Sequence, residues 1–293
     1  MYIDEFCDYL RLERNYSDRT VASYRKDLEL FQKAFMHMDS ELSFLTLDRD
    51  VVRNWIAGMM ESGFRPATVN RKLSTLRSFY NFLLRRGIAE SSPVYGLKGP
   101  KCDKPLPQFV RESEMDELID RTDLGAGFDG LRNRAVIATF YETGIRLAEL
   151  IGMELKDVDF TERTLRVTGK RNKQRIIPFG QELSGILSDY LEARNRLDNT
   201  DPTAFFLNSR GGRVLRSQIY RLVRSSLSKV SSVGKRSPHV LRHTFATTML
   251  NNDAELGAVK ELLGHESLST TQIYTHATFE ELKKIYDKAH PRA

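Results

Sequence analysis

The chain has 293 residues, 40% of them hydrophobic and 29% charged, and its net charge is +6 at neutral pH. This length suits two domains of ordinary size, and the hydrophobic fraction supports a packed core. The two cysteines, Cys7 and Cys102, lie far apart, which excludes a disulfide framework or zinc knuckles and fits a reducing cytosol. The acidic N-terminus is not a signal peptide and no apolar run reaches membrane-spanning length, so we expect a cytoplasmic protein with no membrane partner.

Basic residues are concentrated in two parts of the chain. Residues 65–104 contain nine Lys or Arg and two acidic residues, and residues 202–252 contain nine Lys or Arg and no acidic residue. A local excess of positive charge favours an anionic partner, with nucleic acid as the first candidate. The simpler alternative for either patch alone is a charged face that only contacts solvent.

Apolar residues at helical spacing predict four helices in the first ninety residues. Ser17 and Thr46 are suitable N-caps for the second and third helices. Gly63 and Gly87 are suited to end the third and the fourth. The expected helices span residues 2–14, 18–36, 47–62 and 66–86.

The fourth of these helices carries basic side chains, and basic residues continue beyond it and recur beside a helix expected at residues 217–231. Long cationic side chains can contact the phosphates and groove edges of DNA. An ordinary solvated face is the alternative. Six side chains are predicted DNA contacts on this ground: Arg71, Lys72, Arg77, Lys101, Arg216 and Arg221.

Residues 91–107 are rich in proline, glycine and lysine, which is typical of an extended linker. We therefore place the domain boundary there, with a helical domain at residues 1–90 and a second domain at residues 108–293. A basic linker between two basic domains could lie along DNA and close a clamp round it.

The second domain is predicted to be mainly α with a small antiparallel β-sheet. Three short strands are expected at residues 158–160, 164–168 and 175–178, and a turn with many cations links the last two. Lys170 lies in this turn, where a lysine can be delivered to a site or withdrawn from it, although most such turns are merely polar. Further helices are expected at residues 113–120, 131–143, 181–197 and 217–231, and from Pro238 onward.

Arg146 stands where one expected helix ends at Gly144 and the next begins. The N-terminus of a helix presents free N–H groups and a positive dipole, which suits a phosphate. Glu149, one turn further on, can orient Arg146 as a supporting partner. The alternative is a surface salt bridge between these two side chains.

His239 and Arg242 are three residues apart, so on a helix they share a face. Ser237 is a suitable N-cap for this helix, and Pro238 suits its first turn. An arginine grips a phosphate through two oxygens and a histidine passes protons near neutral pH, so the pair indicates a phosphoryl site. A structural histidine is the simple alternative. A zinc site built on His239 and His243 is not expected, because Arg242 between them would oppose a cation.

Several motifs together resemble the tyrosine recombinase (phage integrase-like) family, most closely the XerC and XerD types of its Xer branch. Residues 143–150, TGIRLAEL, are similar to the family's first arginine box, and Gly169-Lys170 is similar to the glycine-lysine of its β-hairpin. Residues 239–246, HVLRHTFA, are similar to its second box. LLGH at 262–265 and STTQIYTH at 269–276 are similar to its third box and to the segment of its nucleophile.

The resemblance implies both a fold and an activity. It implies a SAM-like core-binding domain at residues 1–90 and a catalytic domain at residues 108–293, together a two-domain DNA clamp. It also implies that Tyr274 attacks a DNA phosphodiester, forms a 3′-phosphotyrosine link and releases a 5′-hydroxyl. Arg171 and Thr248 depart from residues that relatives often carry, outside the six catalytic positions.

The resemblance assigns the remaining catalytic roles to matched residues. A tyrosine with a pKa of about 10 is a poor nucleophile unaided, so nearby cations and His239 are expected to help it lose its proton. Arg146 and Arg242 are expected to clamp the non-bridging oxygens of the transition state. His265 is expected to add a hydrogen bond there, and Lys170 to protonate the leaving 5′-oxygen. These side chains provide the cationic field, so no metal or other cofactor is expected.

The resemblance further implies what the reaction serves. The covalent link conserves the bond energy, so strand exchange through a Holliday junction needs neither ATP nor ligase. Recombining two DNA duplexes requires four protomers, as a homotetramer or as a heterotetramer with a second Xer-type recombinase. Chromosome-dimer resolution at a dif-type site is the expected role, with a DNA translocase of the FtsK type as a candidate activator.

Several alternatives remain open at this stage. The helix expected at residues 279–289 has the apolar spacing to dock on a neighbouring subunit, as the family's C-terminal helix does, or to fold back on its own core. The protein could be an integrase of a mobile element, or relax DNA as a type IB topoisomerase does. A DNA-binding module with a vestigial site is disfavoured, because none of the six catalytic residue types is lost.

Overall fold

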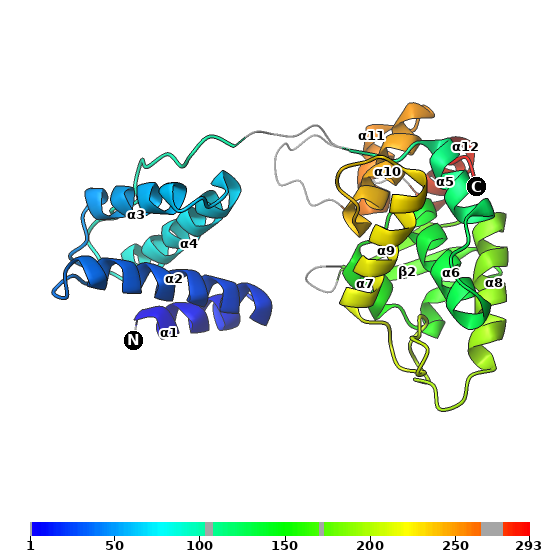
Figure 1. Ribbon diagram of the computed structural model, residues 1–293, viewed down its shortest axis with the longest axis horizontal. Coiled ribbons are helices and arrows are strands. Elements are labelled where there is room, and N and C mark those ends of the chain that lie inside the picture. Colours follow the sequence, from blue (N-terminus) through cyan, green and yellow to red (C-terminus); the bar gives the residue numbers. More distant parts are fainter. Residues whose placement is uncertain (1, 103–107, 170–172, 265–277) are drawn as a thin grey trace. The chain divides into compact units, whose positions relative to one another are not determined.

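A computed structural model of the protein describes residues 2–102, 108–169, 173–264 and 278–293 (Figure 1). The chain divides into two compact units, Met1–Pro105 and Leu106–Ala293, and each has its own hydrophobic core. Within the described residues both units are mainly helical, and the named strands form one small sheet in the second unit. These observations confirm the predicted fold class. None of the helices in these ranges is long and apolar enough to cross a membrane.

The first unit is a set of helices around a core of aromatic rings. Phe6 and Phe79 pack edge to face with ring centroids 5.3 Å apart, and Phe31 lies 4.7 Å from Trp55 between centroids. These contacts join the helices that periodicity predicted, and all four predicted helices are present. The helices are α1 (Tyr2–Asp8), continued by a π-helical turn (Tyr9–Glu13), α2 (Asp18–Met38), α3 (Arg49–Glu61) and α4 (Pro66–Arg85).

The ends of these helices follow the predicted signals except at one cap. Ser17 caps α2, because its side chain accepts a hydrogen bond from a backbone N–H of the first turn. Gly63 and Gly87, which follow α3 and α4, have left-handed φ values of 78° and 66°. The predicted cap Thr46 is wrong. Asp48 caps α3 instead, with two hydrogen bonds of 2.9 Å from first-turn N–H groups.

The first part of the predicted linker folds onto the first unit. Val94 and Leu97 are buried in its core. Arg77 donates a hydrogen bond to the carbonyl oxygen of Leu97, and Asn70 donates one of 2.9 Å to that of Pro100. This part therefore differs from the expectation of an extended segment, because its apolar side chains find a core to enter.

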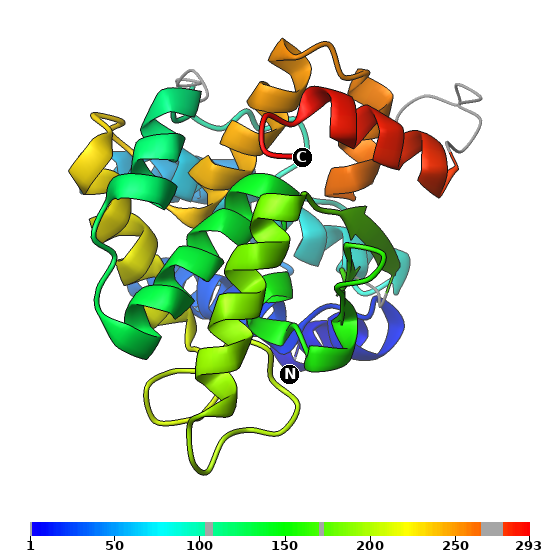
Figure 2. The same ribbon diagram turned by 90° about the vertical axis from the view of Figure 1, so that its right-hand side faces the viewer.

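The second unit is organised around α6, which is buried along most of its length. This helix packs against α8 and α10, and Figure 2 shows α8 lying beside it. Every helix predicted here from periodicity is present. The elements are α5 (Glu112–Asp116) with a π-helical turn (Glu117–Arg121), α6 (Gly127–Thr143), α7 (Leu147–Gly152), a 3₁₀ turn (Leu155–Asp157), β1 (Val158–Asp159), β2 (Thr164–Thr168), β3 (Gln174–Pro178), α8 (Gln181–Asn195), α9 (Arg216–Val230), α10 (Pro238–Asn251), α11 (Leu256–Leu263) and α12 (Phe279–Ala289).

The sheet has the order β1-β2-β3, and both strand pairs are antiparallel, as the hairpin signals predicted. Leu165 pairs with Ile177, and Val167 pairs with Arg175. Cross-strand partners share a face of the sheet, and alternate residues of one strand do too. Arg175 therefore lies on the same face as three buried apolar residues, and this face is turned toward the core.

α12 folds back on its own unit. Leu282, Tyr286 and Ala289 are buried in the second core, and the helix packs against α10, α11 and β3. In this single chain the helix thus covers its own core, which is the fold-back alternative. The physical reason is that the apolar stripe of α12 finds a complete apolar surface within the same chain.

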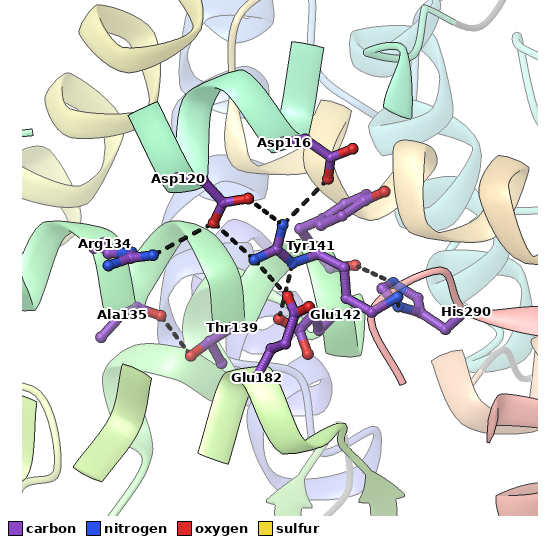
Figure 3. Close-up of polar contacts among 10 residues, drawn as sticks. Asp116, Asp120, Arg134, Ala135, Thr139, Tyr141, Glu142, Glu182 and His290 are labelled. Carbon is purple, nitrogen blue, oxygen red and sulfur yellow. Dashed lines mark hydrogen bonds and ion pairs between the residues drawn. The ribbon is translucent and has the colours of Figure 1, made fainter. Parts of the chain in front are cut away.

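The last residues of the chain fix α12 through a buried arginine. Figure 3 shows the carboxyl groups of Asp116, Asp120, Glu142 and Glu182 converging from α5 and its π-helical turn, α6 and α8. Arg292 is 8% exposed and donates two hydrogen bonds of 2.9 Å to Asp120 and one of 3.2 Å to Asp116. Its guanidinium also lies 2.6 Å from Glu182 and 3.8 Å from Glu142. Because a buried cation requires such partners, the tail is tied to three parts of the unit.

We expect Glu142→Gln to change how stability depends on pH. Glu142 is fully buried, its carboxyl oxygens have no hydrogen-bond partner among the described residues, and burial raises its pKa from 4.5 to about 8. Between these values the folded state keeps a proton that the unfolded chain has lost, so stability falls as pH rises through the window. Glutamine does not ionise, so the variant should lose this fall, which is on the order of a few kcal/mol.

Thermal unfolding midpoints measured from about pH 5 to about pH 9 check this expectation. Glu117→Gln is the matched control, because Glu117 is exposed on the π-helical turn after α5. Parallel curves for Glu142→Gln and the unmodified protein would contradict the assignment of a neutral, buried Glu142.

Candidate active site

A left-handed glycine sets the position of Arg146. As predicted, α6 ends at Gly144, which has a φ of 58°. A Cβ at Gly144 would lie 2.5 Å from a ring carbon of Phe245 on α10, so a larger residue does not fit this turn. The chain then enters α7 with Arg146 at its N-cap position. The close approach of α6 to α10 therefore brings Arg146 near α10.

Glu149 is a buried carboxylate that binds two arginines. Its Oε1 accepts hydrogen bonds from Nη1 of Arg146 at 2.8 Å and from Nη1 of Arg175 at 2.9 Å. Its Oε2 accepts from the backbone N–H of Arg146 at 2.7 Å and from Nη2 of Arg175 at 2.9 Å. Burial by itself would raise the pKa of Glu149, but the bonds from Arg175 and Arg146 keep this pKa below its ordinary value. With its side chain only 2% exposed, Glu149 forms no mere surface salt bridge.

Arg175 was not among the residues predicted from the sequence. It lies on β3 with its side chain 15% exposed, and its Nε donates a hydrogen bond of 2.7 Å to the carbonyl oxygen of Leu262. A signal for it exists in the strand pattern. Ile177 faces the core, so a period of two places Arg175 on the same face, where a guanidinium needs a buried acid. The sequence does not reveal which acid, because Glu149 belongs to another element.

Arg242 is almost fully buried on α10. Its Nη1 donates a hydrogen bond of 2.7 Å to the carbonyl oxygen of Gly144, and its Nη2 donates one of 2.6 Å to that of Leu263. Burial, with the nearby Arg146 as a further cause, lowers the pKa of Arg242 to about 10. The side chain therefore keeps its charge at neutral pH and points toward the ends of α6 and α11.

Both predicted arginines meet at the C-terminal end of α11. Nη2 of Arg146 donates a hydrogen bond of 2.8 Å to the carbonyl oxygen of Gly264, the residue after the one that Arg242 binds. The arginine clamp, as we call Arg146 and Arg242, thus rests on two consecutive carbonyl groups at the negative end of a helix. Two guanidiniums so placed have the donors to bind separate oxygens of one phosphate.

His239 lies one turn before Arg242 on α10, and is exposed. Partial desolvation of its ring, followed by the nearby positive charge of Lys235, lowers its pKa, so a neutral imidazole is favoured at pH 7. Pro238 occupies the first turn of α10 as predicted. Ser237 occupies the N-cap position, but its side chain makes no capping hydrogen bond, in contrast to the predicted cap. Among the described residues, no three His, Cys, Asp or Glu side chains are grouped as a metal site requires.

Three predicted catalytic residues lie outside the described residues: Lys170, His265 and Tyr274. The chain before two of them is described. A Cβ at Gly169 would lie 3.6 Å from Oε1 of Glu149 and 3.8 Å from Nη1 of Arg146. Gly264 accepts the hydrogen bond from Arg146. The residues that precede the hairpin lysine and the third-box histidine are therefore both next to the clamp.

Two of the predicted DNA contacts of the first unit bind a buried acid. Asp27 is 3% exposed and accepts hydrogen bonds from Arg71 and, at 2.9 Å, from Lys72. Arg71 keeps 47% of its side chain exposed, and Arg77 and Lys101 are exposed residues. Lys72 is only 5% exposed, which argues against its predicted DNA contact, because its ammonium neutralises a buried carboxylate.

The predicted DNA contacts of the second unit lie on α9. Arg216 and Arg221 are exposed and have no ion-pair partner in the part of the chain that the structure describes. Arg221 also lines a cavity of about 730 Å³. Three further arginines line this cavity, Arg132, Arg224 and Arg236. Such a surface attracts phosphate groups.

Comparison with known proteins gives matches over nearly the whole chain. Residues 108–281 match the phage integrase family, and residues 3–87 match the N-terminal SAM-like domain of phage integrases. A tyrosine recombinase XerC from Oceanobacillus iheyensis is 42% identical over 297 residues, covering 100% of this chain and 97% of the relative. A XerC from Pelotomaculum thermopropionicum is 41% identical over 303 residues, covering 100% of this chain and 99% of the relative.

Two solved structures share the fold. The XerH site-specific recombinase, bound to its difH substrate in a pre-cleavage complex, has a TM-score of 0.69 at 23% identity and covers 96% of this chain and 82% of that one. The Tn1549 transposon integrase, in complex with circular intermediate DNA, has a TM-score of 0.72 at 18% identity and covers 97% and 98%. At these identities the likeness concerns the fold alone.

Neutralising Arg221 and Lys72 is expected to give different results. Arg221→Met removes an exposed charge, so it should weaken binding to duplex DNA and lower the slope of log K against log salt by about 0.9 if Arg221 contacts one phosphate.

Lys72→Met leaves Asp27 with one cation fewer in a buried place, so it should lower the free energy of unfolding by about 1–3 kcal/mol.

DNA binding at several salt concentrations and chemical unfolding of both variants check these expectations. Lys72→Met should keep the salt slope of the unmodified protein. The placement of Lys72 would be refuted if this variant unfolded normally and lost salt dependence as Arg221→Met is expected to do.

Proposed function

Since the chain belongs to the phage integrase family, as an Xer-type tyrosine recombinase that breaks and rejoins DNA, we propose that it resolves chromosome dimers at a dif-type site. Similarity to XerC recombinases over nearly their full length supports this role. So does the presence in the sequence of all six catalytic residue types of the family. The observation that carries the chemistry is the arginine clamp at the end of α11.

In the proposed reaction the scissile phosphate binds to Arg146 and Arg242. Nη2 of Arg146 and both outer nitrogens of Arg242 donate to carbonyl oxygens, which are neutral acceptors. Charge-assisted hydrogen bonds to an anionic oxygen are stronger than bonds to a carbonyl, so a phosphate can compete for these donors. The advantage grows in the transition state, because negative charge builds up on the non-bridging oxygens there.

Tyr274 is the nucleophile of the proposed covalent step. Its phenolic oxygen forms a bond to phosphorus while the bond from phosphorus to the 5′-oxygen of DNA breaks. His239, with its lowered pKa, assists removal of the phenolic proton. Lys170 gives a proton to the leaving oxygen, and His265 donates a hydrogen bond to the phosphate. A 5′-hydroxyl from a partner strand then reverses the step and releases the tyrosine.

The proposed setting is a cytoplasmic protein–DNA complex of four protomers. Each active site cuts one strand, so exchange through a Holliday junction between two duplexes needs four. The protomers are copies of this chain, or include a second Xer-type recombinase. A DNA translocase of the FtsK type is the proposed activator, in keeping with the Xer resemblance.

A mobile-element integrase is the second candidate. The match of residues 108–281 to the phage integrase family favours it. The two roles differ in the DNA site that is recombined, so substrate choice can separate them.

Tyr274→Phe should abolish a covalent adduct on a nicked suicide duplex that carries a dif-type site. The phenyl ring keeps the shape of the side chain but lacks the oxygen that bonds to phosphorus. Denaturing gels of protein incubated with labelled duplex, with chelator in place of magnesium, measure this adduct. Tyr95→Phe is the matched control and should form the adduct normally, because Tyr95 is 77% exposed on the first unit.

An adduct with Tyr274→Phe equal to that of the control would refute the assigned nucleophile. If the unmodified protein binds the duplex and forms no adduct, addition of a second Xer-type recombinase and an FtsK-type translocase tests whether activation was missing. Continued absence of the adduct would then refute the proposed reaction at this site.

On a supercoiled plasmid with two dif-type sites, the proposed role predicts deletion of the intervening DNA. Removal of one site should abolish the deletion product, because each exchange joins two sites. Gel analysis of plasmids with two, one and no sites measures this. Relaxation without sites would instead indicate topoisomerase-like activity, and recombination only at transposon ends would favour the integrase role.

A further inference from the structure

Arg175 contacts both sides of the arginine clamp from a separate element. Its two outer nitrogens bind the two oxygens of Glu149, the partner of Arg146. Its Nε binds the carbonyl oxygen of Leu262 in the last turn of α11. A Cβ at Gly264 would lie 3.2 Å from Nη1 and Cδ of Arg175, so the side chain runs along the turn that ends this helix.

Three consecutive carbonyl groups at the end of α11 each accept a hydrogen bond from a different arginine. Their distances are 2.7, 2.6 and 2.8 Å. The pairs are Arg175 with Leu262, Arg242 with Leu263, and Arg146 with Gly264. A displacement of Arg175 would therefore shift the helix end against which both clamp arginines are aligned.

Arg175 also limits how Glu149 can bind Arg146. With Arg175 in place, the Arg146 side chain uses only Nη1 to reach Glu149, and its Nη2 is directed to Gly264. Without Arg175, the buried carboxylate would have Arg146 as its main cation. A carboxylate and a guanidinium then favour a two-pronged ion pair, which would draw Nη2 away from the position where a phosphate binds.

We propose that Arg175 is a positioning residue of the recombinase: it keeps Arg146 free of a two-pronged pair with Glu149 and fixes the end of α11 on which the clamp rests. The inference rests on the proposed binding of the scissile phosphate by Arg146 and Arg242. It assigns Arg175 an indirect role, through Glu149 and the α11 carbonyls.

The test measures single-turnover cleavage of the nicked dif-type duplex at saturating protein, with DNA affinity measured in parallel. Arg175→Gln should lower the cleavage rate constant about 100-fold, as expected for a misplaced catalytic group, while the Kd for DNA stays within about threefold. Arg175→Lys keeps the charge but lacks the planar fork of donors. Its cleavage rate constant should therefore lie between those of Arg175→Gln and the unmodified protein. Arg166→Gln is the matched control, because Arg166 is a largely exposed arginine on β2, on the other face of the sheet.

A second variant separates positioning from a general loss of structure. In Arg175→Gln, Glu149 is expected to form a two-pronged ion pair with Arg146. Adding Glu149→Gln removes the charge that holds this pair together. The double variant should therefore cleave at least about tenfold faster than Arg175→Gln alone, a coupling expected for neighbours in one network. A residue needed only for folding would show no such recovery. If Arg175→Gln does not fold, Arg175→Lys with and without Glu149→Gln carries the same comparison.

The outcomes distinguish this inference from the proposed function. Normal cleavage by the folded Arg175 variants would overturn the inference, and so would a loss that Glu149→Gln does not relieve. Either result leaves the proposed function standing, because the unmodified protein and Arg166→Gln still form the adduct. If the unmodified protein forms no adduct even with its proposed partners, the proposed function itself fails.

Discussion

The carboxylate of Glu149 lies out of water between α7, β3 and the end of α11, and the arrangement of the clamp depends on how its charge is compensated. An unpaired carboxylate in such a place would cost several kcal/mol, so folding must bring cations to it. Arg146 comes from the start of α7 and Arg175 from β3. Both side chains then continue to carbonyl groups at the end of α11. One buried charge thereby fixes α7, β3 and the end of α11 relative to one another. Apolar packing alone would define their relative rotation less strictly.

The same solution recurs at two other places in the chain. Asp27 on α2 binds Arg71 and Lys72 on α4, and Arg292 at the C-terminus binds acids from α5, its π-helical turn and α8. Apolar contacts tolerate sliding, whereas hydrogen bonds to charged groups have strict distance and angle requirements. Each network therefore fixes an orientation that the surrounding apolar core stabilises but does not select.

Local patterns were enough to predict the strands, the turn at Gly144 and the helices other than α11, because periodicity and turn chemistry act over a few residues. The motif resemblance placed the arginines of the clamp. Buried ion pairs between residues far apart in the sequence could not be predicted in this way. Lys72 and Asp27 are 45 residues apart, and Arg175 and Glu149 are 26 apart. A basic residue on a helix or a strand is expected to be exposed unless its acidic partner is known, so the sequence alone favours a DNA contact for Lys72 and assigns no site role to Arg175.

The charges around the clamp bear on which state of the substrate it favours. Among the described residues, the guanidiniums of Arg146, Arg175 and Arg242 meet the carboxylate of Glu149 there. Together these four side chains carry a net charge of two positive charges. A phosphodiester carries one negative charge, and in the proposed reaction attack by a phenolate brings a second to the pentavalent transition state. The net charge of these four side chains therefore matches the proposed transition state better than the bound substrate, and such a difference in binding is what accelerates a reaction. Arg175 contributes to this balance without approaching the phosphate, because it offsets the one negative charge that would otherwise cancel Arg146.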